Sequence, residues 1–78
     1  MKYITKIDNE HIVELNGRNI RVTDRIEGNY FVQLGQSAYS GIYVTKGSHE
    51  MKSSGELFLD QYVVALEVVR LIEEHLHE

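Results

Sequence analysis

Cysteine is absent from the chain, which rules out disulfides and metal sites built on thiolates. A chain of 78 residues buries only about 60% of the surface that its unfolded form exposes, so a deep, water-excluded active site would compete with its core. Stability must therefore come from apolar packing or from association with another chain. We expect a single domain over residues 1–78 in a reducing compartment, and we assign it to the cytoplasm.

Long apolar runs are also missing. The longest uninterrupted one covers residues 62–66, whereas a helix that spans a bilayer needs about 18 apolar residues or more. The N-terminal residues alternate between polar and apolar side chains, and a signal peptide needs an unbroken apolar stretch of about 7–15 residues. We therefore expect neither a membrane span nor secretion.

A basic stripe of the kind that nucleic-acid-binding proteins use is not evident in the charge distribution. Residues 1–55 carry seven Lys or Arg against six Asp or Glu, a net of +1, and residues 56–78 carry one Arg against six acids, a net of −5. The two sums give the overall charge of −4. Because nucleic-acid affinity comes largely from neutralising phosphates, this charge balance favours a protein over a nucleic acid as the partner.

What is present in the first two-thirds of the chain is a series of short alternating segments. Residues 2–7 alternate with a period of two, which is typical of a half-buried strand and places Tyr3, Thr5 and Ile7 on one face. The strongest local signal is Asn16-Gly17 between two apolar segments, which predicts a β-hairpin with a two-residue type I′ turn. In that hairpin the side chains that share a face are Val13, Leu15, Ile20 and Val22.

Two further strands are predicted at residues 30–34 and 41–47, and the small polar residues 48–55 are interpreted as an exposed loop. Residues 1–47 then form an antiparallel meander of four or five strands. The fold class is α+β, because one long helix over residues 56–77 follows the meander and packs on one face of the sheet.

The start of this helix is open between two alternatives. Ser53 with Glu56 fits a capping box, which starts the helix near residue 54. Asp60 is a rival N-cap, and residues 56–59 would then extend the sheet. Helical periodicity predicts one core-facing stripe, made of Phe58, Tyr62, Ala65, Val69, Ile72 and Leu76.

A second row on the helix widens its apolar arc beyond what one sheet face requires. Its residues follow an alternating spacing of four and three: Leu57, Gln61, Val64, Val68, Leu71 and His75. Either residues 47–55 or an edge strand covers this row within one chain, or the row is the seam of a homodimer. We favour the homodimer, because so small a domain gains stability from a shared core.

No catalytic or metal-binding pattern is found. Ser37 lies in Gly35-Gln36-Ser37-Ala38-Tyr39, which lacks the second glycine of a nucleophile elbow and precedes a predicted strand rather than a helix. His75 and His77 are two residues apart and diverge on a helix, whereas helical metal ligands are paired four residues apart. We expect no enzymatic activity, no metal and no cofactor.

Tyrosine-rich, weakly charged sequence fills residues 28–48, where Lys46 is the one Lys, Arg, Asp or Glu. Tyrosine supplies contact area at low entropic cost, and Ser, Gly and Asn adapt their hydrogen bonds, so this mixture is common in binding surfaces. The simpler interpretation is that the tyrosines edge the core with their hydroxyls in water. The predicted partner-binding residues are Tyr30, Gln36, Ser37, Tyr39 and Tyr43.

These observations favour a small, non-enzymatic, protein-binding protein that regulates or inhibits an unidentified partner by covering part of its surface. We associate such short chains with phages and other mobile elements. The first alternative is nucleic-acid binding by the sheet, with the basic and stacking side chains Lys2, Lys6, Arg18, Arg21, Arg25, Tyr3 and Tyr30. The second is a structural homo-oligomer.

Overall fold

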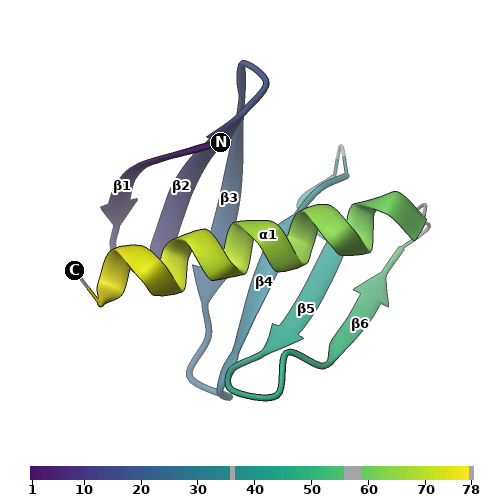
Figure 1. Ribbon diagram of the computed structural model, residues 1–78. Helices are drawn as coiled ribbons and strands as arrows, with labels where there is room; N and C mark the ends of the chain where they lie inside the picture. Colours follow the sequence, from purple (N-terminus) through teal and green to yellow (C-terminus); the bar gives the residue numbers. More distant parts are fainter. Residues whose placement is uncertain (36, 56–58, 78) are drawn as a thin grey trace.

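A computed structural model describes residues 1–35, 37–55 and 59–77 (Figure 1). Its strands form one antiparallel sheet in which each strand pairs with the next along the chain, and one helix crosses a face of that sheet. The elements are β1 (Lys2–Ile7), β2 (Glu10–Leu15), β3 (Arg18–Asp24), β4 (Asn29–Gln33), β5 (Gly41–Thr45), β6 (Met51–Ser54) and α1 (Leu59–Leu76). The predicted α+β class, with a meander followed by a C-terminal helix, is confirmed. The sheet has six strands rather than four or five.

The additional strand lies where we predicted the loop 48–55, so that prediction is wrong for Met51–Ser54. These four residues pair in register with β5, from Met51 opposite Val44 to Ser54 opposite Gly41. An edge strand buries little side-chain surface, and Lys52 and Ser53 are exposed. A polar edge strand can therefore lack the apolar alternation by which strands are recognised.

The helix begins later than the capping box predicted. Ser53 belongs to β6, so it does not cap the helix. Asp60 lies inside the first helical turn, where its negative charge interacts favourably with the positive end of the helix dipole. Leu59 is already helical, which contradicts the interpretation in which it extends the sheet. Residues 56–58, which that interpretation also placed in the sheet, lie outside the described residues.

The Asn16-Gly17 hairpin is confirmed. Leu15 pairs with Arg18 at its mouth, and Asn16 and Gly17 have φ angles of 51° and 79°. Positive φ at both central residues is what a type I′ turn requires. The pair of Val13 and Ile20 follows on the same face, so this local turn sets the register of β2 and β3.

Strand β1 departs from simple alternation. Tyr3 pairs with Val13 and Thr5 pairs with Ile12, so the register shifts by one residue at Ile4. The bulge turns Tyr3 toward the helix but places Thr5 on the opposite face. The prediction that Tyr3, Thr5 and Ile7 share a face is therefore wrong.

The core lies between the sheet and α1. Its buried apolar residues are Val13, Ile20, Val22, Tyr30, Val32, Leu34, Ile42, Val44, Ala65, Val68, Val69 and Ile72. The predicted helical stripe contributes Ala65, Val69 and Ile72, but Leu76, at the last position of α1, is 52% exposed. Val68, which we assigned to the second row, is fully buried in the same core. Gln61 and Val64 of the same row line a hollow together with Leu15 and Ile20, so the end of the β2–β3 hairpin faces this row.

Candidate binding surface on the open face of the sheet

The two faces of the sheet differ in what covers them. Helix α1 crosses one face, which we call the inner face, and none of the described elements covers the other, the outer face (Figure 1). Side chains alternate between the faces along each strand. Strand β4 places Tyr30 and Val32 inward and Phe31 outward, and β5 places Ile42 and Val44 inward and Tyr43 outward.

Phe31 and Tyr43 form the centre of the outer face. They pair directly across β4 and β5, and their ring centroids are 4.7 Å apart with a tilt of 47° between the planes. The guanidinium carbon of Arg25 lies 4.7 Å from the centroid of Tyr43, which is the geometry of a cation–π contact. Glu27 forms an ion pair with Arg25 at 3.2 Å. These contacts give the outer face a preformed aromatic and cationic centre.

Two hollows lie beside this centre. One, of about 260 Å³, is lined by Thr23, Arg25, Phe31, Ala38, Tyr39, Tyr43 and Ser54. The other, of about 410 Å³, is lined by Arg25, Asn29, Tyr43, Thr45, Glu50, Met51 and Lys52. Because Arg25 and Tyr43 line both hollows, they form the ridge between them. Hollows of this size accept one or two side chains of a partner, rather than a drug-sized ligand in a closed cavity.

The loop between β4 and β5 carries Tyr39. The amides of Leu34 and Gly35 donate to the carbonyl of Ser40 at 3.2 and 2.9 Å, which closes the loop at its base. The hydroxyl of Ser37 lies 3.1 Å from that of Ser40 and accepts from the amide of Tyr39 at 3.2 Å. Ser37 thus organises the loop, and the Tyr39 ring is left 83% exposed at the edge of one hollow.

The structure separates the five predicted partner-binding residues. Tyr39 and Tyr43 line the smaller of the two hollows on the outer face, and the hydroxyl of Ser37 accepts a hydrogen bond from the amide of Tyr39. Gln36 lies outside the described residues. Tyr30 is only 4% exposed and belongs to the core, so including it was wrong.

Sequence reasoning missed Phe31 and Arg25, which replace Tyr30 in this surface. The signal was available for Phe31, because Val32 and Leu34 are core-type residues and the alternation places Phe31 on the opposite face. No local pattern connects Arg25 with Tyr43, since the contact depends on three strands pairing in register.

Part of the predicted dimer seam on the helix packs against its own chain. Val68 is fully buried, Val64 and Leu71 pack against the core, and Gln61 is half-buried. The ring of His75 stacks on Tyr3 with centroids 3.7 Å apart. Leu57 lies outside the described residues. The assignment of Val68 to a seam with a second chain was therefore wrong, because this residue is buried within its own chain and the β2–β3 hairpin faces Gln61 and Val64 of the same row.

A buried histidine lies on the inner face, beneath the C-terminal half of α1. His11 is fully buried, its Nδ1 lies 2.9 Å from the hydroxyl oxygen of Tyr3, and its Nε2 has no hydrogen-bond partner among the described residues. Burial, assisted by the positive charge of Lys6, lowers the pKa of His11 below its ordinary value of 6.5. His11 shares a hydrogen bond with the hydroxyl of Tyr3 through Nδ1, so this cluster is a packed part of the core.

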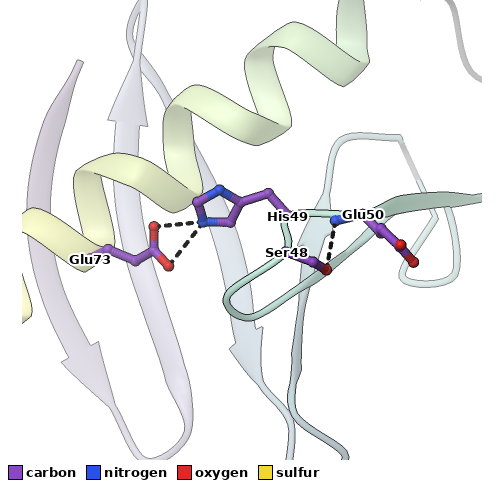
Figure 2. A network of polar contacts seen from close by, with 4 residues as sticks. All are labelled: Ser48, His49, Glu50 and Glu73. Carbon is purple, nitrogen blue, oxygen red and sulfur yellow. Dashed lines mark hydrogen bonds and ion pairs between the residues drawn. The ribbon is translucent and has the colours of Figure 1, made fainter.

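A second histidine connects the loop before β6 to the helix. Figure 2 shows the ring of His49 directed at the carboxylate of Glu73, with Nε2 at 2.9 and 3.1 Å from the two oxygens. Beside it, the amide of Glu50 donates to the hydroxyl of Ser48 at 3.3 Å. The contact fixes the loop at the start of β6 to the inner face, so it supports the fold and leaves the outer face free.

The described histidines and carboxylates form no group of three or more that could hold a metal ion. In the same part of the chain, no helix is long and apolar enough to cross a membrane. The outer face is thus the surface on which aromatic, cationic and hollowed features coincide. A comparison with protein-family models, curated proteins and solved structures found no match to this chain.

Proposed function

We propose that this chain is a small, non-enzymatic protein that binds a partner protein through the aromatic surface formed by Arg25, Phe31, Tyr39 and Tyr43. The observation that carries the proposal is the uncovered face of the sheet, where a Phe–Tyr pair, a stacked arginine and two hollows lie together. Residues that dominate protein–protein affinity are enriched in Tyr, Trp and Arg and lie in pockets.

The sheet holds the side chains of the aromatic surface in place before a partner binds. Phe31 and Tyr43 lie on paired strands, and Arg25 contacts both Glu27 and the Tyr43 ring, so little side-chain entropy is lost on contact. A rigid face on a chain of 78 residues acts most simply by covering a surface of its partner. A regulatory or inhibitory role, in the cytoplasm and of a kind common among phage or mobile-element proteins, is part of the proposal.

Nucleic-acid binding is the second candidate function, and the same face favours it over a purely structural role. Rings on adjacent strands of an open sheet, with Arg25 and Lys52 beside them, resemble in kind the stacking platforms of single-strand binders. Its affinity would fall steeply with salt because each phosphate contact releases counterions. Protein binding through a largely aromatic surface depends on salt much less.

The test is affinity capture from cells of the organism that encodes the chain, with wild type beside three variants. Tyr43→Ala and Tyr39→Ala remove aromatic area from the outer face, whereas Glu67→Ala removes an exposed side chain from α1 and serves as the matched control. We expect one protein to be retained by wild type and the control, and at least tenfold less by Tyr43→Ala, because truncating a central aromatic costs about 2 kcal/mol or more. Equal retention by Tyr43→Ala, Tyr39→Ala and wild type would refute the proposed surface.

A fluorescent single-stranded oligonucleotide, titrated at about 50 and 200 mM salt, decides between the candidates. Binding at the lower salt that falls by orders of magnitude at the higher would replace the protein-binding proposal with the nucleic-acid one. We expect no binding at either concentration.

A further inference from the structure

The two edges of the sheet are built differently. Strand β1 is interrupted by the bulge at Ile4 and carries Lys2 and Lys6, features that discourage pairing with another strand. Strand β6 keeps a regular register with β5 through all of its residues. Strand β6 is short and carries Lys52, but it has no bulge, so of the two edges it is the one whose regular backbone can accept another strand.

The hydrogen-bonding pattern shows which backbone groups of β6 face outward. The amide of Thr45 donates to the carbonyl of Glu50 at 2.8 Å, so Thr45 and Glu50 form a hydrogen-bonded pair. Such pairs alternate along an antiparallel ladder, which makes Tyr43 with Lys52 the next bonded pair. The backbone N–H and C=O groups of Met51 and Ser53 therefore point away from β5, toward the open edge.

We propose that this edge pairs with the β6 edge of a second copy of the chain, antiparallel, around a two-fold axis at Met51. The six strands of each copy then form one continuous sheet of twelve. The outward groups of Met51 bond to those of Met51 in the second copy. The proposal is independent of the aromatic surface as a binding site, because it uses the backbone at the edge of the sheet.

Charge selects this register. Residues that pair across the two copies must have their side chains on the same face of the joined sheet. The two-fold axis must therefore pass through a residue rather than between two residues, which leaves Met51, Lys52 and Ser53 as the candidates. An axis at Lys52 places two lysines opposite each other, which is unfavourable. An axis at Met51 places Lys52 opposite Glu50 of the second copy, and both side chains are exposed on the outer face. Two-fold symmetry forms this Lys–Glu contact twice in each dimer.

Dimerisation at β6 also brings the outer faces of the two copies together. Glu50 and Lys52 line the larger hollow of the outer face. In the dimer, this hollow lies beside the same hollow of the second copy across the axis, while each aromatic centre is complete within one copy. The N-terminal end of α1 lies on the β6 side of the sheet (Figure 1). Leu59 and Val63, in the first turns of α1, are exposed and leave apolar surface for association.

The experiment is sedimentation equilibrium of the full chain over a wide concentration range, with a charge-reversal set. Glu50→Lys and Lys52→Glu each replace two attractive contacts per dimer by two repulsive ones, and we expect each to weaken dimerisation about tenfold or more. The double variant exchanges the charges and should restore wild-type affinity. Arg21→Glu, an exposed reversal away from the edge, is the matched control and should leave the dimer unchanged.

A backbone variant tests strand pairing itself. Ser53→Pro removes an outward N–H that bonds to nothing in β5 and that faces His49 of the second copy in the proposed register, so the fold should persist by circular dichroism while dimerisation weakens. If this variant is misfolded, the charge-reversal set still decides. A wild type that stays monomeric at millimolar concentration overturns the proposal, as does a dimer that withstands Lys52→Glu. Failure of the double variant to recover dimerisation overturns the register at Met51.

Discussion

Replacing the buried histidine by phenylalanine should make the protein less sensitive to acid. In the folded chain, burial first and Lys6 second hold the pKa of His11 below 6.5. In the unfolded chain, the pKa returns to about 6.5. Below that pH the unfolded state binds a proton that the folded state does not, so the free energy of unfolding falls as the pH falls, until the folded-state pKa is reached.

The size of the effect follows from one proton. The slope contributed by His11 is at most about 1.4 kcal/mol of unfolding free energy per pH unit below pH 6.5. The groups that act on His11 are the charges of Lys6, Asp24, Lys46 and His75, together with the rings of Tyr3 and Tyr30 packed around it. Asp24 favours protonation of His11 and the other three charges oppose it.

At neutral pH the same substitution should change stability little. His11→Phe loses the hydrogen bond to Tyr3, worth about 1 kcal/mol, but it also removes an Nε2 that is buried without a partner, which costs about 1–3 kcal/mol. The two terms oppose each other. A phenyl ring also preserves the edge-on packing against Tyr3 and Tyr30, whose centroids are 5.8 and 6.2 Å away.

The assay is urea unfolding of wild type and variant at pH 7.5, 6.5, 5.5 and 4.5. Near pH 7.5 the two free energies of unfolding should agree within about 1–2 kcal/mol. Below pH 6.5 wild type should lose stability faster, by up to about 1.4 kcal/mol per pH unit. His77→Gln, at an exposed histidine, is the control and should follow wild type. A difference between wild type and His11→Phe that is the same at all four pH values would refute the reasoning.

Three further substitutions test the packing. Val68→Ala should lower the free energy of unfolding by about 1–3 kcal/mol in urea unfolding, because Val68 is fully buried. Val63→Ala, on the exposed side of α1, should change it by less than about 0.5 kcal/mol. Equal losses would contradict the observed helix orientation. His49→Ala removes the contact of a partly exposed pair with the helix and should cost about 1 kcal/mol or less, measured by thermal unfolding. Gly41→Ala places a methyl group against the backbone of β4 and the Phe31 ring, so we expect a loss of about 2 kcal/mol or more and a changed near-ultraviolet spectrum of the aromatic surface.

The parts of the fold that sequence reasoning predicted are those set by local chemistry. Asn16-Gly17 specifies its turn with two residues, and the turn then fixes the register of the strands on either side. The apolar period of the helix likewise predicted the burial of Ala65, Val69 and Ile72. Each of these signals lies within one or two adjacent elements.

The errors arose where burial depends on elements distant in sequence. Strand β6 is polar because it lies at an edge, and nothing local distinguishes its residues from a loop. The bulge at Ile4 reverses the faces of β1, and only pairing with β2 reveals it. The wide apolar arc of the helix predicted a second chain because helical periodicity does not show that the β2–β3 hairpin lies against part of that arc.

In the candidate site, the error in the predicted contact residues is a shift of one position along strand β4, which exchanges the two faces of the sheet. Tyr30 and Phe31 are adjacent aromatic residues, and composition alone favoured the tyrosine as a contact residue. Pairing in β4 directs Tyr30 into the core and Phe31 to the outer face. Alternation with Val32 contained this information, whereas the contact of Arg25 with Tyr43 required the folded sheet.

The two proposed interactions use different parts of the sheet, so their effects can be separated. A dimer joined at β6 places both aromatic surfaces on the same face of one continuous sheet, since a two-fold axis perpendicular to the sheet preserves its faces. Such a dimer binds two partner molecules held on one support more tightly than a monomer does, because the second contact is intramolecular. Ser53→Pro should therefore weaken binding to a densely immobilised partner but leave binding to a soluble, monomeric partner unchanged. An equal loss in both formats would mean that the β6 edge itself contacts the partner.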